Sequence, residues 1–129
     1  MKEGGIRNFV GMPAAIRLDA FAARVSDAFG GNVPYQVGSS LAGRDWRDVD
    51  VRLILDDDEF AAMFPDYARI SQLDPKWALL CDALSEIGRQ MTGLPIDFQI
   101  QSMTDANGKH DGPRNALGLR LAPQPSTEG

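Results

Sequence analysis

The sequence predicts an α+β (or α/β) domain, a small mixed β-sheet with helices packed on one face. Two segments carry apolar residues at helical spacing, residues 13–29 and 75–92. Two others have the pattern of strands, residues 49–55 and 94–103. Helical and strand segments that alternate along one short chain favour a layered domain over a helical bundle or a β-sandwich.

Length and composition predict one ordinary globular domain. The 129 residues suffice for one core, and 43% of them are hydrophobic and 24% charged. We divide the chain into a loose N-terminal entry (1–12), one domain (13–122) and a disordered tail (123–129). A formal net charge of −5 gives no general attraction for nucleic acid.

The sequence also predicts the compartment. No apolar run approaches the length of a membrane span, and the start lacks the apolar segment of a signal peptide. The single cysteine, Cys81, excludes an internal disulfide framework. We therefore expect a cytoplasmic protein with no membrane contact.

The first half of the chain is expected to form a helix and two strands. The glycine pair at 30–31 should end the first helix, and residues 32–37 form a short strand candidate. The second strand, 49–55, is followed by the acidic run 56–59, which suits a helix N-terminus better than a metal site. One face of the first helix should be buried: Leu18, Phe21, Ala22, Val25 and Phe29.

The second half is expected to begin with the clearest helix of the chain. Asp74 can cap it, Pro75 suits its first position, and Gly93 ends it. Cys81 on this helix has a structural interpretation, because no histidine or second cysteine accompanies it. The predicted apolar stripe contains Trp77, Leu80, Cys81, Leu84, Ile87 and Met91.

The last third alternates as a strand and then becomes rich in turn residues. In residues 94–103, Ile96, Phe98 and Ile100 lie on one face, and Asp97 lies with two glutamines on the other. Residues 104–116 should form a hairpin connection or a mobile loop. A final edge strand is predicted from three alternating leucines, Leu117, Leu119 and Leu121.

Two carboxylates at the start of the second strand predict a metal site. Asp48 and Asp50 point the same way because side chains alternate along a strand. Acidic groups this close repel, and a cation or a basic group normally keeps them together. Asp97 presents a third carboxylate on the polar face of another strand.

The order of these residues resembles the nucleotidyltransferase superfamily, which includes DNA polymerase β, antibiotic nucleotidyltransferases and the minimal nucleotidyltransferases. The resemblance covers Gly38-Ser39, then Asp48-Val49-Asp50-Val51, then Ile96-Asp97-Phe98, over roughly residues 33–101. The eight residues between Ser39 and Asp48 are about one fewer than is usual in that family. The resemblance implies a nucleotidyltransferase-like fold.

The resemblance also implies a site for magnesium and nucleotide. Asp48, Asp50 and Asp97 would hold two Mg²⁺ ions, with Mn²⁺ as a substitute, and would help to activate an attacking hydroxyl. Gly38 would let backbone approach the phosphates, and Ser39 would donate hydrogen bonds to them. The phosphate-binding or nucleotide-binding residues would be Gly38, Ser39, Ser40, Arg44 and Arg47.

Several basic residues keep two interpretations. Arg44 and Arg47 could contact phosphates or could lie in a solvated loop. Arg52 could simply pair with Asp50 or Gln99. Lys109 and His110 could reach a phosphate or the acceptor, although exposure in a loop is the simpler interpretation for a histidine without a partner in sequence.

The resemblance predicts an enzyme that transfers a nucleoside monophosphate from a nucleoside triphosphate, ATP among them, to a hydroxyl. The acceptor would be a small molecule, an RNA end or a protein. The alternative is a noncatalytic nucleotidyltransferase-like module that binds nucleotide or a protein partner, as an antitoxin-like protein does. Almost nothing follows residue 121, so loops, a second subunit of a homodimer or a protein partner would recognise the acceptor.

Overall fold

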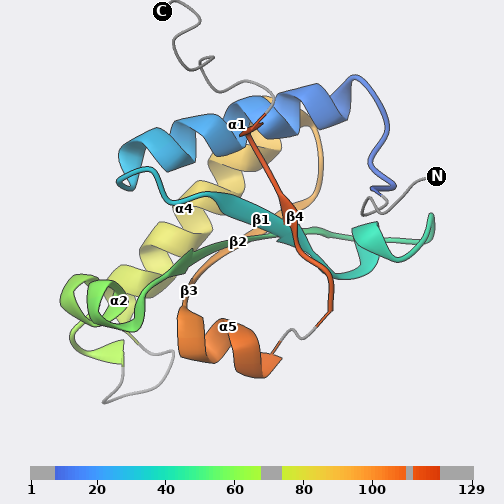
Figure 1. Ribbon diagram of the computed structural model, residues 1–129. Coiled ribbons are helices and arrows are strands. Elements are labelled where there is room, and N and C mark those ends of the chain that lie inside the picture. Colours follow the sequence, from blue (N-terminus) through green and yellow to red (C-terminus); the bar gives the residue numbers. More distant parts are fainter. Residues whose placement is uncertain (1–7, 68–73, 110–111, 120–129) are drawn as a thin grey trace, which may run out of the picture.

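The computed structural model describes residues 8–67, 74–109 and 112–119 as an α+β fold (Figure 1). The predicted α+β class with a small mixed sheet is confirmed. The elements are, in chain order, α1 (Ala14–Ala28), β1 (Pro34–Val37), the 3-10 helix η1 (Gly38–Leu41), β2 (Val49–Leu55), α2 (Asp57–Met63), α4 (Pro75–Thr92), β3 (Ile96–Ser102), α5 (Met103–Lys109) and β4 (Asn115–Ala116).

The sheet has four strands in the order β3-β2-β1-β4. β1 pairs antiparallel with both β2 and β4, whereas β2 and β3 run parallel. Parallel neighbours need a long crossover, and the chain between β2 and β3 contains α2 and α4. β2 and β3 therefore begin at the same edge of the sheet.

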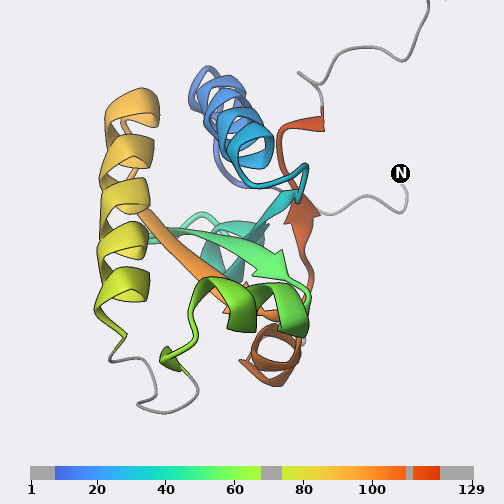
Figure 2. The ribbon, with the colours of Figure 1, turned by 90° about the vertical axis from the view of Figure 1, so that its left-hand side faces the viewer.

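One face of the sheet is covered by α1 and α4 (Figure 2). The predicted apolar face of α1 is confirmed for Leu18, Phe21, Ala22 and Val25, which are buried, whereas Phe29 follows the helix and is half-buried. The glycine pair that follows adopts positive φ angles, +70° and +85°, which stop the helix. From the sheet, the core residues on this face are Val49, Val51, Leu53, Leu55, Ile96, Phe98 and Ile100.

Helix α4 begins and ends as predicted but packs along a different line. Asp74 accepts hydrogen bonds from the N–H groups of Lys76 and Trp77, at 2.9 and 3.2 Å, and caps the helix. The predicted stripe residue Ile87 is 49% exposed, so its assignment to the core is wrong. The buried residues of α4 are Cys81, Ser85, Gly88 and Thr92.

Close packing explains why small residues of α4 meet the core. A Cβ added at Gly88 would lie 3.1 Å from side-chain atoms of both Phe21 and Ile96, so α4 approaches these neighbours more closely than a larger residue would allow. Ser85 Oγ accepts a hydrogen bond from the N–H of Phe98 at 2.8 Å. The larger apolar residues of α4 flank this line and pack against the core from its sides.

Residues 103–109 form helix α5, so the predicted hairpin or mobile loop is wrong for this part. α5 lies on the side of the sheet away from α1, and the expectation of helices on one face is therefore corrected (Figure 1). Ser102 Oγ accepts from the N–H of Asp105, and Asp57 accepts from the N–H of Thr104 at 3.0 Å. These side chains bind backbone N–H groups at the helix start, and buried Ala106 anchors the helix.

The two ends of the described chain also differ from expectation. Val10, in the segment expected to be loose, is buried, and the N–H of Phe9 donates to the carbonyl of Ser40. The last strand is only the two residues of β4, because Gly118 has φ +83° and turns the chain. Residues 1–7, Leu121 and the tail from residue 123 lie outside the described residues.

Within the described part of the chain, no helix is long and apolar enough to cross a bilayer.

Candidate functional site

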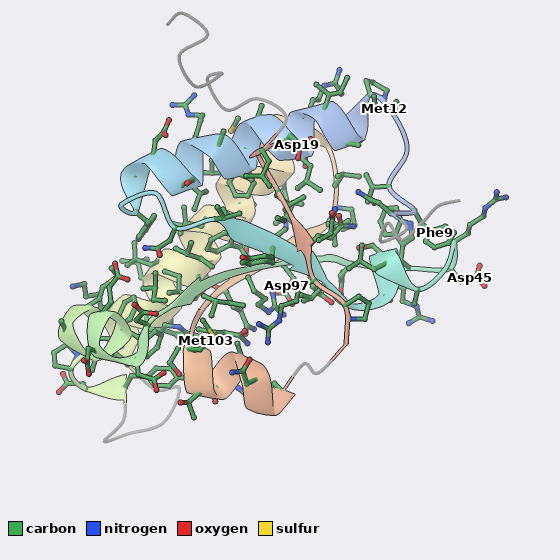
Figure 3. The ribbon with its side chains drawn as sticks, in the orientation of Figure 1. Phe9, Met12, Asp19, Asp45, Asp97 and Met103 are labelled. Atoms are coloured by element: carbon green, nitrogen blue, oxygen red, sulfur yellow. The ribbon has the colours of Figure 1, made fainter. Side chains whose placement is uncertain are left out.

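Asp50 and Asp97 lie side by side on the parallel strands β2 and β3. They are register partners. Because the residues before and after each of them are buried in the core, both side chains point to the opposite face of the sheet. Figure 3 shows Asp97 on the side of the sheet away from α1. The Asp50 side chain is 22% exposed and that of Asp97 44% exposed, so both carboxylates are accessible from solvent.

Gly38 places backbone directly against the Asp50 carboxylate. Val37 is the register partner of Asp50 in the antiparallel pair of β1 and β2, and Gly38 follows it with φ +81°. A Cβ at position 38 would lie 2.4 Å from Asp50 Oδ2. Both the φ angle and this close approach therefore favour glycine.

Arg52 lies next to the two carboxylates, on the same face of β2 as Asp50. It is 6% exposed, and its Nη2 is 3.9 Å from Asp50 Oδ1 and 3.6 Å from Asp97 Oδ2. Of the two partners that the sequence left open for Arg52, Asp50 and Gln99, the structure shows an ion pair with Asp50 and adds one with Asp97. A fixed positive charge offsets part of the repulsion between the two aspartates.

Asp48 lies one residue before β2 and is exposed. Across residues 8–67, 74–109 and 112–119, no group of three or more His, Cys, Asp or Glu side chains is arranged to hold a metal ion. The structure thus brings Asp50 and Asp97 together but does not gather all three predicted ligands into one cluster. The predicted role of Asp48 stays a prediction.

The predicted phosphate-binding residues divide into exposed and buried ones. Ser39, Arg44 and Arg47 are exposed, and Arg44 lines a hollow with residues 8–11. Ser40 is fully buried, and its hydroxyl accepts a hydrogen bond from Gln36 Nε2 at 2.7 Å. The Ser40 hydroxyl therefore helps to hold the turn, and its predicted contact with phosphate stays a prediction.

A buried polar network around Gln36 holds this turn. Gln36 Nε2 also donates to Asn8 Oδ1 at 3.1 Å, and Asn115 Nδ2 donates to Gln36 Oε1 at 3.2 Å. Gln36 is fully buried, and a buried amide with partners on three segments fixes their relative positions. No local pattern in the sequence predicts this network, because Asn8 and Asn115 lie far from Gln36 along the chain.

A cleft of about 220 Å³ adjoins Gly38. Lys109, at the end of α5, lines it, and its Nζ is 3.4 Å from Asp105 Oδ2. The sequence offered Lys109 as a candidate phosphate contact, and the structure places it in the same cleft as Gly38. His110 lies outside the described residues. The cleft is lined by Val37, Gly38, Leu41, Ala42, Lys109, Gly112 and Pro113.

Cys81 lies on the other face of the sheet, in the apolar core. Burial raises the pKa of its thiol to about 11, which keeps the thiol protonated near neutral pH. Its burial and pKa agree with the predicted structural role.

Comparison of the chain with models of protein families, with curated proteins and with solved structures finds no match. The resemblance to nucleotidyltransferases therefore stays a prediction.

Proposed function

We propose that this protein is a metal-dependent nucleotidyltransferase that transfers a nucleoside monophosphate from a nucleoside triphosphate to a hydroxyl acceptor. The observation that carries the proposal is the adjacent pair of Asp50 and Asp97, with the backbone of Gly38 against the Asp50 carboxylate. The pair supplies acidic oxygens for a hard cation, and the glycine turn supplies a place where phosphate can approach the backbone.

The donor set fits Mg²⁺ or Mn²⁺. Two carboxylates supply part of an octahedral oxygen shell, and phosphate oxygens and water can supply the rest. Bound ions of this kind neutralise charge on the phosphates and orient the attacking hydroxyl. Asp50 and Asp97 would hold the ion between them, and exposed Asp48 would contribute to a second ion.

Other residues of this face would hold the nucleotide. The backbone of Gly38 lies against the Asp50 carboxylate, and Ser39 is exposed at the start of η1. Lys109 lines the adjoining cleft and can pair with a phosphate oxygen. Arg44 and Arg47 are exposed on the loop before β2, where they can meet the triphosphate or the acceptor.

One observation favours a second candidate, a noncatalytic module that binds nucleotide or a protein partner. Arg52 already lies within 4.0 Å of both carboxylates, and an internal cation can hold such a pair together without a metal. In that case the face would bind without transferring a nucleotide.

Incubation with each labelled nucleoside triphosphate, Mg²⁺ and a cell extract as the source of acceptor tests the proposal. We expect a labelled product from the parent protein and none from Asp50→Asn or Asp97→Asn, because each removes a metal ligand. Asp82→Asn, which removes an exposed carboxylate from α4, is the matched control and should keep the activity.

Two results would contradict the proposal. Binding of the triphosphate with no transfer to any acceptor would favour the noncatalytic module. Transfer that survives in both site variants would show that Asp50 and Asp97 do not carry the chemistry.

A further inference from the structure

Trp46 lies in the loop between η1 and β2 and is half-buried. Its indole Nε1–H donates to the carbonyl of Phe9 at 3.3 Å, and the ring packs against the hydrophobic core. Together the hydrogen bond and the packing restrict the orientation of the indole. The part of the ring that remains accessible is therefore presented in a fixed place.

Trp46 lines a hollow beside the turn that contains Gly38. This hollow measures about 220 Å³. Its lining residues are Ser39, Ala42, Gly43, Asp45 and Trp46. Ala42 also lines the cleft that contains Gly38 and Lys109, so the two hollows adjoin each other at η1. In the described part of the chain, Trp46 is the one aromatic residue that lines either of them.

Size and chemistry suit the two hollows to different parts of a nucleotide. Sites for whole drug-sized ligands measure about 300–1,000 Å³, whereas each of these hollows measures about 220 Å³. Each therefore suits one part of an extended ligand. The cleft with Gly38 and Lys109 offers phosphate a backbone approach and a cation. The hollow with Trp46 offers an aromatic surface, on which any nucleobase can stack.

We propose that the hollow beside Trp46 is the subsite for the base of the nucleoside triphosphate, and that the base stacks on the indole. The inference rests on the proposed function. The base would lie against Trp46 while Gly38, Ser39 and Lys109 contact the phosphates. Because every base has an aromatic face, Trp46 would raise the affinity for nucleotides without choosing strongly among them.

A purely structural Trp46 would act differently. It would stabilise the loop through its contacts with Phe9 and the core. Its loss would then weaken the binding of a nucleotide and of a phosphate chain without a base to the same extent. Stacking, in contrast, contributes only to ligands that carry a base.

Inorganic tripolyphosphate, which has the phosphate chain and no base, isolates the contribution of stacking. Calorimetric titrations in Mg²⁺ compare it with analogues of ATP, GTP, CTP and UTP that carry a methylene group between the α- and β-phosphates. The proteins are the parent, Trp46→Leu, Trp46→Phe and Trp77→Phe. Trp77→Phe is the matched control, because Trp77 is also half-buried but lies on α4, where it donates to the carbonyl of Ile100. Circular dichroism establishes that each variant is folded.

We expect Trp46→Leu to bind the nucleotide analogues about tenfold more weakly than the parent and tripolyphosphate within about twofold of the parent. Trp46→Phe keeps an aromatic surface and should lose less, and Trp77→Phe should resemble the parent. The sequence has two tryptophans, so Trp77→Phe leaves Trp46 as the single indole fluorophore. Its emission should change with the nucleotide analogues and not with tripolyphosphate.

The outcomes separate the inference from the proposed function. A folded Trp46→Leu that keeps its affinity for the nucleotide analogues, or that loses affinity for them and for tripolyphosphate equally, overturns the inference alone. If Trp46→Leu does not fold, or if tripolyphosphate binds too weakly to measure, the fluorescence decides. Emission of Trp46 that stays constant while an analogue binds to Trp77→Phe then overturns the inference. A parent that binds neither the analogues nor tripolyphosphate overturns the proposed function.

Discussion

Strands β2 and β3 present apolar side chains on one face of the sheet and charged side chains on the other. Toward α1 and α4, β2 and β3 present Val51, Leu53, Phe98 and Ile100, all almost fully buried. Toward α5, the alternate residues of the same strands present Asp50 and Asp97, which are partly open to solvent, and Arg52, which is buried. The apolar face fixes the strands, and this fixed register sets the spacing of the carboxylates on the other face.

The faces also differ in how well their polar groups are satisfied. On the helix side, Ser85 Oγ exchanges hydrogen bonds with the N–H and the carbonyl of Phe98. On the other side, Arg52 Nε and Gln101 Oε1 are buried without a hydrogen-bond partner in the part of the chain that the structure describes. Both atoms lie on the carboxylate side of the sheet.

The largest expected effect is on the helix face. Phe98→Ala should lower the free energy of unfolding by about 3–5 kcal/mol, because it removes a fully buried ring and leaves a cavity. Phe98 also packs edge to face against Phe21, with ring centroids 5.9 Å apart. Denaturant unfolding measures the change. Gln99→Ala, on the opposite face of β3, is the control, and an equal loss in both variants would remove the distinction between the faces.

A smaller effect is expected at the turn beside the carboxylates. Gly38→Ala should cost about 1–2 kcal/mol, because an L-residue is disfavoured at φ +81°. Its Cβ also meets Asp50 Oδ2, so the carboxylate must move and triphosphate binding in Mg²⁺ should weaken. Calorimetric titration of the folded variant measures the binding. Gly43→Ala, where a Cβ meets nothing within 4 Å, is the control. Unchanged affinity would exclude Gly38 from the site.

Asp97→Asn should change the stability of the metal-free protein by less than about 1 kcal/mol. Its carboxylate is 44% exposed, and partly exposed ion pairs contribute little. The same variant should lose the rise in melting temperature that Mg²⁺ with triphosphate gives the parent. Thermal melting with chelator and with Mg²⁺ tests both expectations. A loss of several kcal/mol in chelator would mean that Arg52 and Asp97 form a structural ion pair.

The smallest effect concerns the contact between α2 and α5. Hydrogen bonds from the hydroxyl and the N–H of Thr104 lower the pKa of Asp57. A lowered pKa in the folded state stabilises the protein above the unfolded pKa of about 3.9, and this stabilisation is lost as the pH falls through the folded pKa.

Asp57→Asn should remove that pH dependence. Melting temperatures measured from about pH 6 to pH 2.5 should fall less steeply in acid for the variant than for the parent, with Asp58→Asn, a neighbouring exposed carboxylate, as the control. Parallel curves for the parent and Asp57→Asn would show that the contact with Thr104 contributes nothing to acid stability.

The sequence alone determined the elements whose signals are local. The helix capped by Asp74 and ended by Gly93, the buried face of α1 and the strands β2 and β3 follow from periodicity and capping within about 15 consecutive residues. The outward placement of Asp50 and Asp97 follows from the alternation of each strand. These features needed no information about distant parts of the chain.

Features that depend on contacts between separate segments could not be predicted from local patterns. Residues 103–109 contain an asparagine-glycine pair typical of a turn, yet they form a helix because Ser102 and Asp57 bind its first N–H groups and Ala106 is buried. Because β2 and β3 pair in parallel with this register, Asp50 lies beside Asp97, and Arg52 lies next to both carboxylates. Side chains 45 residues or more apart meet only when the whole sheet forms, because the contact free energy that orders them comes from packing along the entire chain.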